Sequence, residues 1–389
     1  MDRDCPFIMS TLHDKHIHLV SFDIPFPPDY GGIIDVYYKI KALNDSGIKV
    51  HLHCFEYGRA KSSELEMICY QVNYYKRELG LKYFFNRVPY IVVTRQNTLL
   101  FNNLLKDDYP IIYEGLHTCI FAGRDELKNR IQIVRMHNIE SKYYNSLSDS
   151  SISIVDKIFF KMEAFKLNLY EKSLGNHLSV AVINEGEADY YKNRDYNIFR
   201  SVTYIPPFHE NSKVISLPGR GNYVLYHGNL SVSDNEQVVL FILNKIFSGL
   251  QIPLIIAGKN PTKKIIKTSE KFSHVKVIGN PDSKEMNSLL INAHINLLPA
   301  INANGMKLKL LNSLYKGRFC VVNDLMVRST GLEDMCYIAN NKYDYHNTIS
   351  ELFTKDFTVD DLNYRKSALT GKYSNLKSAG KLLKLLKYD

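Results

Sequence analysis

Short apolar runs alternate along the chain with longer stretches in which apolar residues recur every three or four positions. A short apolar run bounded by turn residues is typical of a buried strand, and the recurring spacing is typical of an amphipathic helix. The runs that we predict as strands are 17–22, 49–55, 73–77, 111–114, 131–136, 180–184 and 199–207, followed by 223–226, 253–257, 275–278, 295–298 and 319–322. Strands that alternate with helices form parallel sheets covered on both faces, so the pattern predicts an α/β protein.

The predicted strands fall into two sets, separated by a stretch that contains Ser, Lys, Pro and Gly. A chain of 389 residues is long enough for two domains with separate cores. We therefore predict an N-terminal Rossmann-like domain over 1–207, an interdomain link over 208–222, and a C-terminal Rossmann-like domain over 223–360. The remaining segment, 361–389, is predicted to be helical and to pack back across the domains.

Lysines and leucines recur at helical spacing near the C-terminus, over 374–388. A helix of this kind is able to lie on an anionic membrane leaflet. The interpretation that we favour is a closing helix whose leucines pack across the domains and whose lysines are solvated.

The amino-acid composition indicates which class of protein this is and which kind of partner it suits. The chain has 45% hydrophobic and 23% charged residues, which is ordinary for a globular protein, and a net charge of +9, which suits an anionic partner. The six cysteines include no C-x-x-C pair and are interpreted as reduced. The charged N-terminus has no apolar signal-peptide region, and no run is long enough for a membrane span. We expect a cytoplasmic protein, with peripheral attachment to the inner face of the plasma membrane left open and no nucleic-acid partner.

Candidate chemistry begins with the stretch 305–317, which reads GMKLKLLNSLYKG. It follows an apolar run and an Asn/Ala/Gly turn, so it predicts a loop that opens a helix. Lys307 and Lys309 lie in the first turn, where positive charge opposes the helix dipole. A polyanion such as a diphosphate at the helix N-terminus explains this placement. Considered alone, the stretch is better explained as a surface helix with solvated lysines.

A second turn of interest is Gly31-Gly32, which follows a proline-rich loop and opens a predicted helix between two strands. Such a βαβ unit can receive an anion at the start of its helix. The G-x-G-x-x-G fingerprint of dinucleotide binding does not occur here.

Polar residues gather where predicted strands end, and ligands of parallel sheets bind at those ends. They are Glu114 after one strand, Arg135, His137, Asn138 and Glu140 around the next, Asn184 and Glu185 after a third, and Gly228 and Asn229 in the second set. His137 is explained either as a buried core histidine or as a site residue. His51 and His53 share one strand face without a third ligand, so we interpret them as structural.

Together these motifs resemble bacterial glycosyltransferases of family 4, which have the GT-B architecture of two Rossmann-like domains facing across a cleft. The resemblance rests on Gly31-Gly32 with the following L-x-x-x-G-I-x-V pattern at 43–50, on the R-x-H-N-x-E run at 135–140, and on the spacing of 305–317. The family's Glu-x7-Glu signature falls on Asn304 and Asn312, and its usual strand-end cations fall on Asn229 and Asp234. Lys307 and Lys309 would replace those cations.

The resemblance implies a role for each candidate residue. It implies catalytic roles for His137, Lys307 and Lys309; donor binding by Gly31, Gly32, Gly228, Asn229, Asn304, Gly305, Met306 and Asn312; and an acceptor or cleft position for Glu114, Arg135, Asn138, Glu140, Asn184 and Glu185.

The function implied is transfer of a hexosyl unit from a nucleotide sugar to a glycan or lipid-linked acceptor in cell-surface polysaccharide biosynthesis. The resemblance also implies retention of anomeric configuration, with no metal and no cofactor. One alternative is a non-catalytic protein that binds nucleotide or glycan, which the two asparagines at 304 and 312 favour. A nucleotide-sugar epimerase is a weaker alternative, because its chemistry uses carboxylates that are absent at those positions.

Overall fold

The computed structural model describes residues 14–193, 198–302 and 307–388 and contains two parallel β-sheets. The first has seven strands in the order β3-β2-β1-β4-β5-β6-β7. Their bounds are β1 Lys15–Ser21, β2 Ile48–Glu56, β3 Gln71–Lys76, β4 Ile111–Glu114, β5 Gln132–Met136, β6 Ser179–Val182 and β7 Ser201–Tyr204. The second sheet has six strands in the order β10-β9-β8-β11-β12-β13. Their bounds are β8 Val224–Asn229, β9 Leu254–Lys259, β10 Val275–Gly279, β11 Ile295–Leu298, β12 Phe319–Val322 and β13 Tyr337–Ile338.

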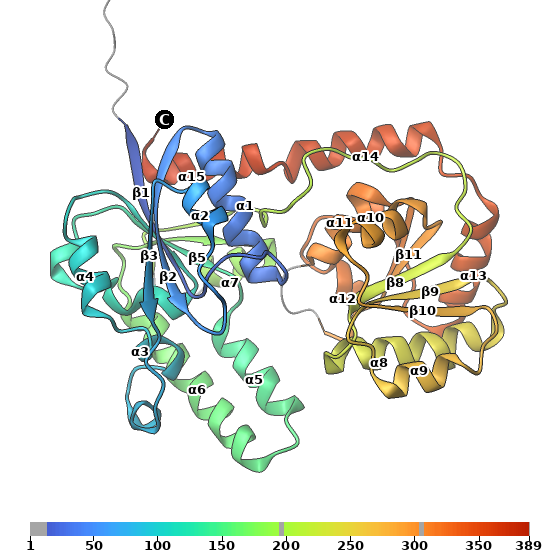
Figure 1. Cartoon of the computed structure of the whole chain (residues 1–389), viewed down its shortest axis with the longest axis horizontal. Coiled ribbons are helices and arrows are strands. Elements are labelled where there is room, and N and C mark those ends of the chain that lie inside the picture. The colour runs from blue at the N-terminus through green and yellow to red at the C-terminus, as the bar shows by residue number, and fades with distance from the viewer. Residues whose placement is uncertain (1–13, 194–197, 303–306, 389) are drawn as a thin grey trace, which may run out of the picture.

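Helices cover both faces of the first sheet (Figure 1). They are α1 Gly31–Asp45, α2 Ser63–Ile68, α3 Tyr90–Val93, α4 Thr98–Leu104, α5 Glu140–Ser150, α6 Ile154–Ser173 and α7 Glu185–Lys192. The pleat of β1 directs Ile17 and Leu19 into a core with α1, while Val20 packs in a second core on the opposite face. This burial on both faces explains why the strand is an apolar run without polar alternation.

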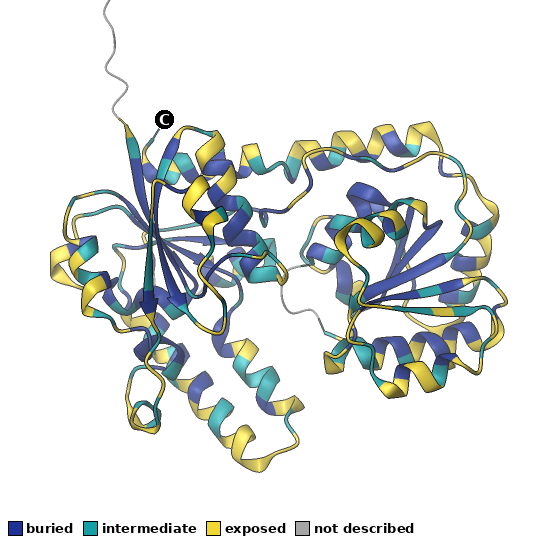
Figure 2. Ribbon diagram, in the orientation of Figure 1, coloured by how far each residue is buried: buried dark blue, intermediate teal, exposed yellow. Residues whose placement is uncertain are grey.

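The second sheet is covered in the same way by α8 Ser233–Phe241, α9 Lys263–Ser269, α10 Ser283–Asn292, α11 Leu308–Lys316, α12 Asp324–Val327 and α13 Lys342–Thr354. Figure 2 shows its strands buried beneath helices whose outer faces are exposed. Helix α8 continues into a single π-turn over Ile242–Ile246. The predicted fold class, two facing Rossmann-like domains, is confirmed.

Two C-terminal helices cross from the second sheet to the first: α14 Val359–Lys372 and α15 Asn375–Leu386 (Figure 1). Leu382 and Leu386 on α15 are buried in the core that α1 and β1 share. The apolar face of this helix therefore packs on protein, and its lysines lie outside. No helix among the described residues is both long enough and apolar enough to cross a membrane.

Candidate active site

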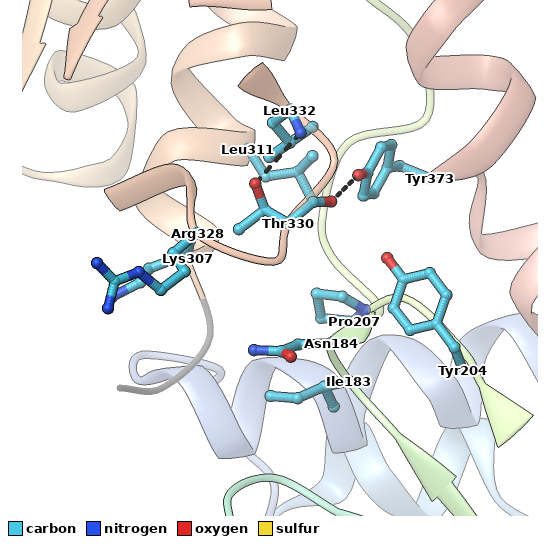
Figure 3. Close-up of a pocket in the computed structure, with 10 residues that line it drawn as sticks. All are labelled: Ile183, Asn184, Tyr204, Pro207, Lys307, Leu311, Arg328, Thr330, Leu332 and Tyr373. Carbon is cyan, nitrogen blue, oxygen red and sulfur yellow. Dashed lines mark hydrogen bonds between the residues drawn. The ribbon is translucent and has the colours of Figure 1, made fainter. Parts of the chain in front are cut away.

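A pocket lies between the two domains, where the carboxyl ends of their strands face each other (Figure 3). The first domain supplies Ile183, Asn184, Tyr204 and Pro207, and the second domain supplies Lys307, Leu311, Arg328, Thr330 and Leu332, with Tyr373 at the junction of α14 and α15. In Figure 3 the side chains of Lys307 and Arg328 extend toward the same side of the pocket. This is the position at which open α/β sheets bind ligands.

The two lysines predicted from the sequence lie together at the start of α11. Lys307 immediately precedes the helix, and its ammonium donates to the carbonyl of Asn302 at 3.3 Å. The Lys309 ammonium lies 3.5 Å from the Asn235 side-chain oxygen and over the Tyr226 ring at 5.3 Å. Burial lowers the pKa of each lysine to about 8, and the charge of Lys309 adds to the effect on Lys307. Asp234 acts in the opposite direction on both pKa values without offsetting the shift.

The Gly-Gly turn opens α1, as the sequence predicts. A side chain on Gly32 would place its Cβ 2.8 Å from the ring of Phe22, so this close approach requires glycine. The preceding loop contacts the other domain, because the Asp29 carboxylate lies 3.6 Å from the ammonium of Lys259 at the end of β9. The loop at Gly31 and Gly32 therefore lies opposite the strand ends of the second domain.

Across from that loop, Gly228 and Asn229 end β8. The side-chain oxygen of Asn229 accepts a hydrogen bond from the Ser231 hydroxyl at 2.8 Å. The backbone carbonyl of Asn229 accepts one from the side-chain amide of Asn235 at 2.9 Å. Asn229 thus shapes the turn from β8 into α8, next to the residue that Lys309 contacts.

Beneath the first-domain side of the cleft lies a buried charge network, which we call the Lys39 network: Asp35, Lys39, Glu114, Arg135 and His137. The Lys39 ammonium lies 2.6 Å from Glu114 and 3.0 Å from Asp35. Arg135 binds Asp35 through Nε at 3.1 Å and Nη2 at 2.9 Å. Burial would raise the pKa of Glu114, but Lys39 and His137 outweigh it and hold that pKa below its ordinary value.

His137 lies at the upper edge of this network, after the end of β5. Its Nε2 lies 2.9 Å from the Glu114 carboxylate, which can only accept, so Nε2 carries the proton. Its Nδ1 is buried and has no hydrogen-bond partner among the described residues. A neutral His137 therefore keeps Nδ1 as an acceptor for a hydroxyl group of a ligand.

The structure gives Glu114 and Arg135 a different position from the predicted one. Their exposed fractions are 0% and 1%, so they lie below the cleft and do not line it. Arg135 also donates to the carbonyls of Ile205 at 2.7 Å and Pro206 at 3.1 Å. It thereby fixes the segment that leads into the interdomain link to β5, which is a structural contribution to the site.

Three residues of the Lys39 network are also candidate metal ligands. Asp35, Glu114 and His137 are the three described residues whose ligand atoms could reach one ion, since those atoms lie within 4.8 Å of one another. The Lys39 ammonium bonds to both carboxylates and provides the positive charge that a metal ion would bring. These residues do not fit a metal while Lys39 occupies the position.

A second group of acids continues from His137 into α5 and α7. Glu140 is 2% exposed, and burial together with the charge of Glu171 raises its pKa to about 8. The Asn138 side chain hydrogen-bonds to Glu140 and acts to lower that pKa. Burial and Glu140 likewise raise the pKa of Glu187 to about 8.

The remaining predicted residues cap a helix or connect separate parts of the chain. Asn184 accepts from the Glu187 backbone N–H at 2.9 Å and caps α7, while Glu185 pairs with Lys372 of α14 at 2.9 Å. Asn312 accepts from the Asn211 side chain of the link at 2.7 Å. The predicted donor residues Asn304, Gly305 and Met306 lie outside the described residues.

Sequence reasoning missed Asp35, Lys39, Lys259 and Arg328. Asp35 and Lys39 share the predicted apolar face of their helix with Val36, Ile40 and Leu43, and charges on such a face are a signal of buried pairing. Nothing in the local pattern distinguishes Lys259 or Arg328 from solvated surface residues.

Comparisons with known proteins agree with this architecture. No protein-family model matches the chain. A protein of Klebsiella pneumoniae named as an uncharacterized 44.6 kDa protein in the cps region is 27% identical over 349 residues, which is 84% of this chain and 88% of that protein.

Solved structures resemble the chain along almost its whole length. A glycosyltransferase from Rickettsia africae has a TM-score of 0.64 at 12% identity, covering 96% of this chain and 98% of that one. Staphylococcus aureus TarM, solved with UDP, has a TM-score of 0.63 at 13% identity, covering 96% and 99%. An Escherichia coli trehalose-6-phosphate protein bound with UDP-2-fluoro glucose has a TM-score of 0.61 at 12% identity, covering 96% and 99%. The fold is therefore GT-B.

Proposed function

We propose that this protein is a glycosyltransferase that moves a hexosyl unit from a nucleotide sugar to a glycan or lipid-linked acceptor. The observation on which the proposal rests is the pair of half-buried lysines at the start of α11, beside the interdomain pocket. Their lowered pKa values mean that Asp234 does not offset the cost of burying two positive charges. A diphosphate between the domains would place negative charge beside both ammonium groups.

The chemistry then follows from the position of the charges. The bond between the anomeric carbon and the diphosphate oxygen breaks, and a bond from the acceptor hydroxyl oxygen forms on the same face of the sugar. The hydroxyl proton goes to the departing phosphate oxygen. Lys307 and Lys309 stabilise the charge that develops on the leaving group, and Nδ1 of His137 accepts a hydrogen bond from a sugar hydroxyl.

This same-face route needs no carboxylate nucleophile. In a double displacement a carboxylate attacks the anomeric carbon, and the matching family positions in this chain are Asn304 and Asn312. We therefore propose retention of configuration through the departing phosphate. The Klebsiella relative named for its cps region favours a role in polysaccharide biosynthesis.

Thermal shift of the purified protein with UDP, GDP, ADP or CDP tests donor binding, because a ligand of the folded state raises the melting temperature. We expect one nucleotide to give a rise that persists in EDTA. Lys307→Ala with Lys309→Ala should weaken its binding at least about a hundredfold, since a hydrogen bond to a charged group contributes roughly 1.5–3 kcal/mol.

Lys263→Ala with Lys264→Ala is the matched control, because these lysines also lie in the first turn of a helix of the same domain but are exposed. The control should bind as the wild type does. No shift with any diphosphate, or equal losses in both variants, would contradict the proposal. Nucleotide binding without sugar transfer to any acceptor would favour the non-catalytic alternative.

A further inference from the structure

The α5–α6 hairpin projects from the first domain with an apolar face turned to solvent (Figures 1 and 2). We call this face the α6 stripe: Ile154, Val155, Ile158, Met162, Phe165 and Leu169. The exposed fractions of Ile154, Ile158 and Phe165 are 74%, 63% and 63%. Most of these positions recur every three or four residues, so they share one side of the helix. Ala164 and Leu167 are buried on the opposite side of the helix, where α6 packs on the domain. The α6 stripe is therefore a second apolar face.

A neighbouring 3₁₀-helix, η1 (Leu81–Phe85), enlarges the apolar surface. It is attached to α6 by a hydrogen bond from the Lys166 ammonium to the Phe84 carbonyl at 2.7 Å. The rings of Phe84 and Phe159 also contact each other, with centroids 5.1 Å apart. Leu81 is 79% exposed and Phe85 91%, so η1 adds apolar side chains beside the stripe.

Positive charges accompany these apolar side chains. Lys157 and Lys161 are exposed on α6, and Lys82 and Arg87 are exposed in or after η1. Of the three acids in α6, Asp156 is exposed in the first turn, while the other two are turned inward. Glu163 accepts from the Tyr90 backbone N–H at 2.6 Å, and Glu171 accepts from the Tyr191 hydroxyl at 2.9 Å. The exposed side of α6 therefore combines apolar residues with an excess of lysine.

We propose that the α6 stripe and η1 dock on an anionic lipid bilayer, with α6 lying in the plane of the interface. An amphipathic helix with lysines beside its apolar face binds such a surface through buried apolar area and attraction to acidic headgroups. A second copy of the chain fits less well, because a twofold contact through this face would bring the same lysines together. The C-terminal helix α15 is not available for this purpose, since Leu382 and Leu386 are buried.

The docking surface is connected directly to the candidate active site. α5 begins at Glu140, three residues after His137, and packs along α6. Docking through α6 would therefore hold the His137 edge of the cleft close to the headgroup layer. The inference rests on the proposed function for its purpose, because a lipid-linked acceptor would be presented there, but bilayer binding can be measured without any transfer reaction.

Co-sedimentation of the full chain with vesicles tests this inference. We expect binding to vesicles of equimolar phosphatidylcholine and phosphatidylglycerol, with weaker binding at high salt and to phosphatidylcholine alone. The triple variant Ile154→Ser, Ile158→Ser, Phe165→Ser should lower the partition coefficient by about tenfold or more, because it removes much of the apolar area. Lys157→Glu with Lys161→Glu should lower it by about tenfold or more, because it reverses two charges at the anionic surface.

Matched controls lie on the C-terminal helices, where Val359, Tyr364 and Leu376 are also exposed. Their triple serine variant, and Lys377→Glu with Lys384→Glu, should bind vesicles as the wild type does. Absence of wild-type binding to the anionic vesicles, or equal loss in the control variants, would overturn the inference. Self-association of the wild type that the α6 triple variant abolishes, without vesicle binding, would assign the face to a second copy.

The nucleotide thermal shift separates this inference from the proposed function. If vesicle binding fails while the nucleotide shift persists, the docking surface is wrong and the donor site stands. If vesicle binding depends on the α6 stripe while no nucleotide binds, the docking surface stands and the proposed function is wrong.

Discussion

The charged side chains on the two sides of the cleft differ in whether ion pairing or burial determines the direction of their pKa shifts. In the first domain, burial would raise the pKa of Asp35 and Glu114. Arg135 and Lys39 outweigh it at Asp35, and Lys39 and His137 outweigh it at Glu114, so each pKa is held below its ordinary value. In the second domain, Lys307 and Lys309 have pKa values lowered to about 8. In the first set ion pairing outweighs burial, whereas in the second set burial outweighs the attraction of Asp234.

This difference distinguishes residues that hold the structure of the site from residues that bind a ligand. A compensated network needs no further partner and holds β5, α1 and the interdomain link in place. An incompletely offset pair destabilises the free protein and becomes favourable when an anion binds. We infer that the first domain positions His137 through the Lys39 network, while the second domain binds the anionic part of the donor.

The largest expected effect is loss of compensation on the first-domain side. Lys39→Ala leaves the buried carboxylates of Asp35 and Glu114 without their ammonium. Removing one partner of a buried ion pair costs roughly 3–5 kcal/mol, and we expect that loss in the free energy of unfolding measured by urea denaturation.

The control for Lys39 is Lys41→Ala, an exposed lysine on the same helix, which should change stability by no more than about 0.5 kcal/mol. Similar small changes in both variants would mean that the Lys39 network is not internally compensated as we describe it.

The second effect concerns the lysine pair and has the opposite sign. Lys307→Met with Lys309→Met should stabilise the free protein by about 2 kcal/mol at pH 7, since one pKa unit corresponds to about 1.4 kcal/mol and remaining solvent contact screens the charges. Each lysine titrates near pH 8 when folded and near about pH 10.4 when unfolded. Within that range the unfolded chain binds more protons, so wild-type stability rises with pH.

The difference between the double variant and the wild type should therefore be largest below about pH 8 and disappear toward about pH 10.4. Urea denaturation of both proteins across this pH range measures the stability difference. Because the same tyrosines titrate in both proteins, their contribution cancels in that difference. A variant that is less stable than the wild type at every pH would show that the lysines are compensated after all.

The fold was predictable because its strands are buried on both faces. Continuous apolar runs such as Ile295–Leu298 and Phe319–Val322 became β11 and β12 without a shift of either boundary. The edge strand β13, Tyr337–Ile338, has two residues and is too short to form a pattern, so it was missed. The sequence predicted both Lys307 and Lys309 in the first turn of the helix, but α11 begins at Leu308, so Lys307 immediately precedes it.

The site was predictable only where local spacing or family resemblance marked it. Lys307 and Lys309 stand out because positive charge is unusual at a helix start. The pairing of Lys39 with Glu114 depends on a contact between residues far apart in the chain, which no local pattern contains. The α6 stripe shows a related limit, because periodicity predicts an apolar helix face but does not say whether protein, lipid or water covers it.

Glu140 provides the smallest and most discriminating test, because it is a first-domain acid that is not compensated. Its folded pKa of about 8 lies above the ordinary value, so the folded state binds more protons than the unfolded chain between about pH 4.3 and that value. Stability attributable to this group is therefore present at low pH and is lost as the pH rises through the folded pKa.

Glu140→Gln removes this dependence while keeping the shape of the side chain. We expect little change in the free energy of unfolding at pH 5 and a gain of about 1 kcal/mol at pH 8.5. The gain is small because the glutamine amide has two N–H groups, and the buried site must provide a hydrogen-bond partner for the second one. Asp149→Asn, an exposed acid on the same helix, should show neither change. Equal gains at both pH values would mean that Glu140 is ionised in the folded protein. Every buried acid near His137 would then be a stabilised carboxylate, in contrast to the lysine pair on the other side of the cleft.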